Sequence, residues 1–168
     1  MRDLSRLRRL YASAAFVALL VGVGFYCVAR QPESVYFLTL WGVQGSNVDL
    51  SLGVLGNHLP TFLHVYAFIM LTLVVIAPSR VYAIAICAAW FVVDSLFELG
   101  QIAVVAKEIA NYVPEWFREI PFLENTTDYF LHGTFDVIDL YSIAFGSVAA
   151  FLTYLSNALR LHKGGSNA

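Results

Sequence analysis

The stretch between Trp90 and Gln101 places acidic and amide side chains at the end of a long apolar segment. It reads WFVVDSLFELGQ and carries Asp94, Glu98 and Gln101. On an α-helix these positions lie at about 0°, 40° and −20°, so the three side chains share one narrow face. Ionisable side chains within a membrane span are costly, and they usually face a bundle interior or a water-filled cavity. The sequence therefore predicts a polar site that the other helices surround.

The composition is that of an integral membrane protein. Of the 168 residues, 59% are apolar and only 13% are charged. A helix needs about 20 apolar residues to cross a bilayer. We predict a single domain over residues 1–168 that is all-α, a four-helix membrane bundle with spans at about 11–29, 59–77, 81–101 and 134–155. No basic patch of the kind that binds nucleic acid is present, so no nucleic-acid partner is expected.

The connections between the spans carry further signals. The segment 31–57 contains Tyr36–Trp41, whose aromatic residues suit the membrane interface. Pro60 is expected in the first turn of the second span, where its missing N–H costs nothing. After the third span we expect continued helix at the membrane surface over 102–112, a short interfacial turn or helix at Pro114–Arg118, and a polar connection over 124–132.

The distribution of lysine and arginine sets the expected orientation, because positive residues favour the cytoplasmic side of a membrane. The two termini and the turn between the second and third spans carry Arg2, Arg6, Arg8, Arg9, Arg80, Arg160 and Lys163. The two longer loops carry only Arg30, Lys107 and Arg118, together with several acidic residues. Both termini are therefore expected in the cytoplasm, with the two longer loops outside.

Depth along the helices, at about 1.5 Å per residue, brings other polar residues to the level of Glu98. Glu98 and Asp94 are expected about 5 and 10 Å beneath the outer surface. His64 is expected about 8 Å down its own span, and the acids of the fourth span about 3 to 8 Å down. We predict one ligand-binding cluster near the outer surface, made of His64, Asp94, Glu98, Gln101, Asp136 and Asp139.

The fourth span places its acids on the face that packs against another helix. Residues recur every three or four positions in the stripe His132, Asp136, Asp139, Ile143, Gly146 and Ala150. Gly146 and Ala150 form a small-xxx-small pair, which lets another helix approach closely. Asp136 and Asp139 are therefore expected inside the bundle rather than toward lipid.

Structural roles compete with a site role for several of these residues. Asp136 lies in the first turn of its helix, where an acid caps free N–H groups and suits the helix dipole. Glu98 lies near a helix C-terminus, where the dipole disfavours an anion, so it needs a partner, a metal or a proton. His64 could simply hydrogen-bond one of the acids. His58 lies about 120° from the His64 face and is expected to be a surface residue.

A histidine among several carboxyl groups allows three kinds of chemistry. A divalent cation could bind as a cofactor to His64, Glu98, Asp136 and Asp139, although no local motif such as HExxH supports it. Clustered acids repel one another, so one that is held protonated could act as a general acid or base. The candidates for that catalytic role are Glu98, Asp139 and Asp94. The same groups would also serve a proton or cation path, and the residues leave open whether the protein is an enzyme.

Three short motifs between residues 57 and 150 resemble those of the VanZ-like membrane proteins. They are Asn57–Tyr66 (NHLPTFLHVY), Phe97–Gln101 (FELGQ), and Gly133–Gly146, in which a glycine follows the second aspartate by seven residues. The chain departs from the family pattern in two places. No arginine precedes Asp136, since residues 132–134 are His, Gly and Thr, and Ile143 stands where the family often has asparagine.

The resemblance implies a small multi-pass protein of the bacterial inner membrane that is linked to the cell envelope. Some members of the family are tied to resistance to teicoplanin-type glycopeptide antibiotics, and the family name supplies no reaction. Our lead hypothesis is an outward-facing cluster that binds a lipid headgroup or a lipid-linked ligand. One alternative is a non-catalytic subunit or assembly protein, partnered with another membrane protein, whose acids form a polar lock between helices. The other is a proton- or cation-coupled transporter.

Overall fold

The computed structural model describes residues 2–29, 53–76, 79–121 and 123–165. These residues form six α-helices and one 3-10 helix, without any strand: α1 Arg2–Ala29, α3 Gly53–Val75, α4 Arg80–Leu99, α5 Ala103–Tyr112, η2 Glu115–Glu119, α6 Thr126–His132 and α7 Val137–Gly165. Helices α1, α3, α4 and α7 each contain a stretch long and apolar enough to cross a membrane. The prediction of an all-helical chain with four membrane-spanning helices is confirmed at this level.

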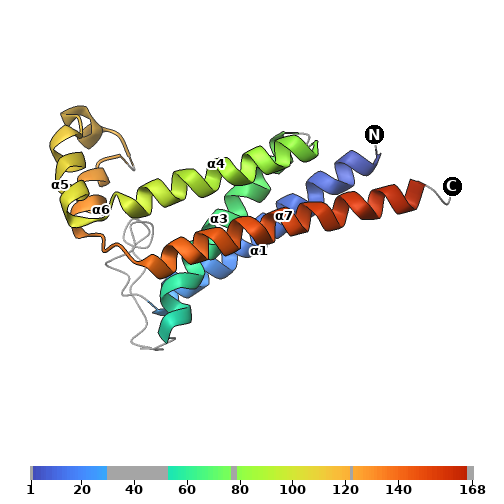
Figure 1. Ribbon diagram of the computed structural model, residues 1–168, viewed down its shortest axis with the longest axis horizontal. Coiled ribbons are helices and arrows are strands. Elements are labelled where there is room, and N and C mark those ends of the chain that lie inside the picture. The colour runs from blue at the N-terminus through green and yellow to red at the C-terminus, as the bar shows by residue number, and fades with distance from the viewer. Residues whose placement is uncertain (1, 30–52, 77–78, 122, 166–168) are drawn as a thin grey trace.

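The long helices pack around α3. Helix α3 contacts α1, α7 and α4, and α4 also contacts α7. The fully buried side chains include Val65, Ile69 and Met70 of α3, Tyr11 of α1 and Ile143 of α7. The N-terminal end of α1 and the C-terminal end of α7 lie at the same end of the bundle, whereas α5 and α6 lie at the opposite end (Figure 1). We call the opposite end, which carries residues 100–136, the loop end.

The close approach that the small-xxx-small pair predicts is present between α7 and α3. A Cβ atom added at Gly146 would lie 2.7 Å from the backbone carbonyl oxygen of Phe62 and 3.3 Å from the Cβ of Val65. Ala150, one turn further along α7, is completely buried. The backbones of α3 and α7 therefore meet at a position that only glycine allows.

Two side-chain hydrogen bonds join the long helices within the apolar bundle. The Trp90 indole N–H of α4 donates to the Thr72 hydroxyl of α3 at 2.9 Å. The hydroxyls of Tyr66 on α3 and Thr153 on α7 lie 3.2 Å apart. Such interhelical bonds between polar side chains help helices associate in membranes.

We expect Trp90→Phe to lower the free energy of unfolding by about 1 kcal/mol, because it keeps most of the ring but removes the bond to Thr72. The measurement is unfolding in mixed micelles of rising dodecyl sulfate content, followed by circular dichroism. Trp116→Phe is the control, since Trp116 is a largely exposed residue of η2. Equal stability of Trp90→Phe and Trp116→Phe would show that the bond contributes nothing.

Helix α3 begins earlier than predicted. It starts at Gly53, and Pro60 lies inside the helix rather than in its first turn. Proline lacks an N–H, so the interior position leaves a carbonyl of the preceding turn without its usual helical partner. Neighbouring helices and local adjustments make such prolines tolerable in membrane helices. The consequence for the site is that His58 belongs to α3 and has a defined face.

The loop end is more helical than predicted, and it turns where continuous helix was expected. Helix α4 ends at Leu99, and α5 is a separate helix that begins at Ala103. The supposed polar connection over 124–132 contains α6, whose Phe130 is buried. A Cβ added at Gly100 would lie 2.5 Å from the Phe130 ring, so Phe130 packs directly on the corner between α4 and α5.

Two further predictions concern the connections. A short helix does occur at Pro114–Arg118, as the 3-10 helix η2. The aromatic segment Tyr36–Trp41 lies outside the described residues.

Candidate carboxyl–histidine site

Four ionisable side chains from three segments meet at the loop end. His58 comes from α3, Glu98 from the last turn of α4, Asp136 from the residue directly before α7, and Asp139 from the first turn of α7. The packing of α7 against both α3 and α4 brings these segments together. We call these four side chains the acidic cluster.

The His58 imidazole lies between two aspartates. Its Nδ1 atom is 3.0 Å from Asp139 Oδ1, within hydrogen-bond distance. A carboxylate can only accept a hydrogen bond, so this contact places a proton on Nδ1. On the other side of the ring, Nε2 lies 3.7 Å from Asp136 Oδ2. Nε2 therefore faces the more exposed of the two carboxyl groups, since the Asp136 side chain is 42% exposed and that of Asp139 only 19%.

Glu98 is a buried carboxyl group of the acidic cluster. The residue is 7% exposed, and its Oε1 accepts a hydrogen bond from the backbone N–H of Asp136 at 2.8 Å. Because the dipole at a helix C-terminus disfavours an anion, Glu98 is expected to have a partner, and the Asp136 N–H is that partner. This bond also ties the end of α4 to the start of α7.

Asp136 has a structural role in addition to its place beside His58. Its Oδ1 accepts the backbone N–H of Ile138 at 2.8 Å, so the side chain caps the first turn of α7. Its other carboxyl oxygen faces His58. The capping role considered from the sequence is therefore present, and one oxygen is left for another partner.

His64 lies apart from the acidic cluster and pairs with a different acid. Its Nε2 is 3.9 Å from Asp94 Oδ1, and its ring lies 4.4 Å from that of Phe68 between centroids. The His64 side chain is 53% exposed. The other Asp94 oxygen and the Ser95 hydroxyl are buried without a partner among the described residues. The six predicted residues therefore form more than one group.

The expectation that His58 lies on the protein surface is wrong. His64 lies six positions after His58, which rotates one side chain by about 120° relative to the other, so His64 faces α4 and His58 faces α7. A signal for this existed in the sequence. His58, Phe62, Val65 and Ile69 follow helical spacing, and Phe62 and Val65 are the residues that meet Gly146 of α7.

Gln101 also lies outside the acidic cluster. It follows the end of α4, and its side-chain amide donates to the Tyr129 hydroxyl of α6 at 3.0 Å. A Cβ added at Gly133 would collide with the Gln101 Oε1 atom, so only glycine leaves room for this side chain. Since α4 ends at Leu99, the shared face predicted for Asp94, Glu98 and Gln101 does not reach Gln101.

The described residues offer no ready metal site. No group of three or more His, Cys, Asp or Glu side chains within them has the arrangement that would hold a metal ion. The proposed ligand set also divides, because His64 is beside Asp94 while Glu98, Asp136 and Asp139 are near His58.

Comparison of the chain with protein-family models, with curated proteins and with solved structures gave no match. The resemblance to VanZ-like proteins thus remains a prediction that rests on three short motifs. One residue of the first motif, His58, and residues of the other two, Glu98, Asp136 and Asp139, form the acidic cluster.

Proposed function

We propose that this chain is a VanZ-like inner-membrane protein of the bacterial cell envelope whose acidic cluster binds a lipid headgroup or a lipid-linked ligand. Four span-length helices support a multi-pass protein. The basic residues near both termini lie at the end opposite the acidic cluster, which favours an outward-facing cluster. A link to glycopeptide resistance follows from the resemblance alone.

The observation that carries the proposal is the placing of His58 between Asp136 and Asp139, with the buried Glu98 carboxyl group bonded to the Asp136 N–H. The acidic cluster holds three carboxyl groups and one imidazole, so hydrogen-bond acceptors and negative charge are in excess. A site of this kind suits a ligand group that is cationic and rich in N–H or O–H donors. An ammonium group on a lipid headgroup meets both conditions.

The experiment is calorimetric titration of the micelle-solubilised protein with short-chain phosphatidylethanolamine and, separately, phosphatidylcholine. The first lipid has an ammonium that donates hydrogen bonds, and the second has a quaternary ammonium that cannot. We expect tighter binding of phosphatidylethanolamine, by about tenfold for one or two charge-assisted hydrogen bonds. Equal affinity for the two lipids would contradict an ammonium-binding site.

His58→Gln and His64→Gln form a matched pair for the same titration. The His58 change removes the ring that holds Asp139 and faces Asp136, so the preference for phosphatidylethanolamine should disappear. The His64 change affects only the pair with Asp94 and should preserve the preference. Loss of the preference in His64→Gln alone would move the site to the Asp94 pair.

The second candidate function is a polar lock within a non-catalytic membrane subunit. The bond from the Asp136 N–H to Glu98 and the cap that Asp136 provides to α7 favour it, because both join or order helices. A lock requires no ligand, so it predicts that variants of the acidic cluster lose folded protein and that no headgroup preference exists in the wild type.

A further inference from the structure

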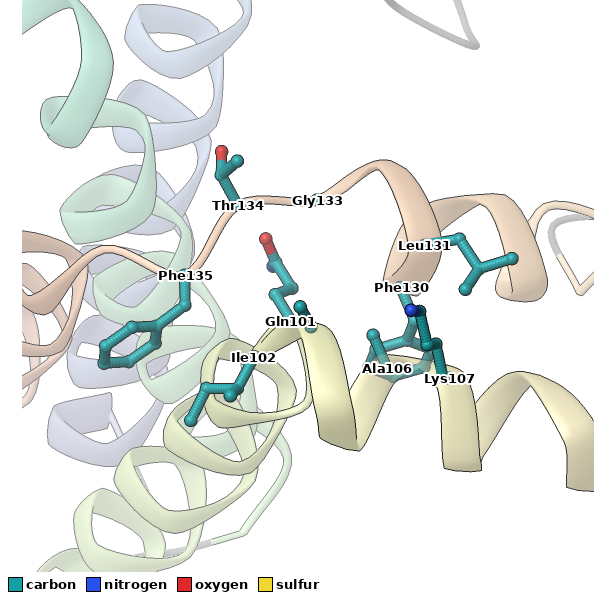
Figure 2. Close-up of a pocket in the computed structure, with 10 residues that line it drawn as sticks. Gln101, Ile102, Ala106, Lys107, Phe130, Leu131, Gly133, Thr134 and Phe135 are labelled. Atoms are coloured by element: carbon teal, nitrogen blue, oxygen red, sulfur yellow. The ribbon is translucent and has the colours of Figure 1, made fainter.

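A cavity of about 390 Å³ lies at the corner between α4 and α5, apart from the acidic cluster. The start of α5, the end of α6 and the link 133–135 enclose it (Figure 2). Most of its lining is apolar: Ile102, Ala103, Ala106, Phe130, Leu131 and Phe135. Its volume falls within the range of about 300–1,000 Å³ that ligand pockets occupy. We call it the corner pocket.

Lys107 supplies a positive charge to the lining of the corner pocket. Its side chain extends from α5 toward α6 (Figure 2). Among the ion pairs formed by the described residues, none involves Lys107. The amide of Gln101, also in the lining, already donates to Tyr129. The pocket therefore combines a largely apolar lining with one ammonium group that forms no ion pair with another residue of the described part of the chain.

Several contacts hold the walls of the corner pocket in place. Phe130 stacks on Phe97 of α4 with 5.9 Å between ring centroids. The absence of a side chain at Gly100 lets Phe130 reach the corner, and Gly133 leaves room for the Gln101 side chain in the same way. These contacts join α6 and the link to the end of α4, so the pocket is formed before a ligand arrives.

We propose that the corner pocket binds an anionic phospholipid, with its phosphate on Lys107 and the adjoining part of one acyl chain among the apolar residues. Charge complementarity selects an anion, and the apolar lining selects one with a hydrocarbon body. The bilayer is the source of such a molecule, because the pocket begins where the membrane-spanning helix α4 ends. Val104 beside the pocket and Leu131 in its lining are exposed apolar residues, which suits an interfacial position. None of the four side chains of the acidic cluster takes part.

The test is native mass spectrometry of the full chain released from nanodiscs made of phosphatidylglycerol and phosphatidylcholine in equal amounts. We expect the wild type to retain phosphatidylglycerol preferentially. Lys107→Gln should lower that retention about fivefold, since one lysine near a membrane surface contributes about 1 kcal/mol. Arg118→Gln is the matched control, because it removes a basic side chain from η2, outside the pocket lining.

A second pair of variants tests the pocket itself rather than surface charge. Ala103→Phe fills the corner pocket and should lower retention as much as Lys107→Gln. Val104→Phe adds the same ring to the neighbouring residue, which is 75% exposed and outside the lining, and should change nothing. Equal retention in Ala103→Phe and Val104→Phe would overturn the proposal, as would equal loss in Lys107→Gln and Arg118→Gln.

Two further results distinguish this proposal from two alternatives, which are binding of free phosphate and binding of the lipid at the acidic cluster. If inorganic phosphate at millimolar concentration displaced phosphatidylglycerol from the wild type, the site would bind phosphate rather than a lipid, and the proposal would fail. Glu98→Gln should retain phosphatidylglycerol fully. Loss of retention in that variant would show that phosphatidylglycerol binding depends on the acidic cluster rather than on the corner pocket, which overturns the proposal.

Discussion

Glu98→Ala is expected to lower the free energy of unfolding by about 1.5–3 kcal/mol, the range for a hydrogen bond to a charged group. The change removes the acceptor of the Asp136 N–H, which lies at the junction between α4 and α7. No other acceptor for that N–H is present among the described residues. Unfolding in mixed micelles of rising dodecyl sulfate content gives the difference. Glu108→Ala is the control, because Glu108 is an exposed residue of α5.

Glu98→Gln separates a binding role from a lock. Glutamine keeps an oxygen that can accept the Asp136 N–H, so most of the stability lost in Glu98→Ala should return. The variant nevertheless removes one carboxyl group from the acidic cluster, and the preference for phosphatidylethanolamine should weaken. A glutamine variant as unstable as the alanine variant would favour the lock. A stable variant with unchanged lipid preference would exclude Glu98 from the binding site.

The long helices could be predicted from composition because a membrane span is a property of about 20 consecutive residues. An error of a few residues at either end of a span does not change the apolar composition of the whole segment. The end of α3 nearest the loops shows the limit of this approach. Pro60 predicts a helix that begins near residue 59, whereas α3 begins at Gly53 and includes the proline. Helix α3 packs on α1 and α7, and such tertiary contacts can stabilise helical turns that the local sequence does not predict.

The wrong expectation for His58 has another origin, namely which side of α3 meets another helix. The rotation of about 120° between His58 and His64 is correct, but the face that carries His58 meets α7 rather than the protein surface. The structure therefore shows His58 between Asp136 and Asp139. On α7, Asp139 faces His58 of α3, as the stripe with Gly146 and Ala150 predicts, whereas the Asp136 side chain is 42% exposed.

The loop end could not be predicted because its helices are short and are stabilised by contacts distant in sequence. Helix α6 has seven residues, fewer than an isolated helix needs to be stable. Its Phe130 packs on Phe97 and on the surface that Gly100 leaves open. These partners lie about 30 residues away in the chain, so the periodicity of 124–132 alone gives no sign of them. The corner pocket depends on the same contacts, so it could not be predicted from the sequence either.

Gly146→Ala is expected to lower the free energy of unfolding by about 1–3 kcal/mol, the usual cost of overpacking a tight core. Its Cβ would lie 2.7 Å from the Phe62 carbonyl oxygen, which belongs to the backbone and cannot rotate away. Helices α3 and α7 must therefore separate. Gly24→Ala in α1 is the matched control, because a Cβ there meets nothing within 4 Å. It should cause no loss of stability in the same mixed-micelle unfolding measurement.

The separation of α3 and α7 also has a consequence for the acidic cluster. His58 lies one helical turn from Phe62 on α3, and Asp139 lies two turns from Gly146 on α7. A shift between the two backbones should therefore lengthen the 3.0 Å contact between His58 and Asp139. Gly146→Ala should weaken the headgroup preference in the folded protein, whereas Gly24→Ala should not. Loss of stability with an unchanged preference would show that the site does not depend on the contact between α3 and α7.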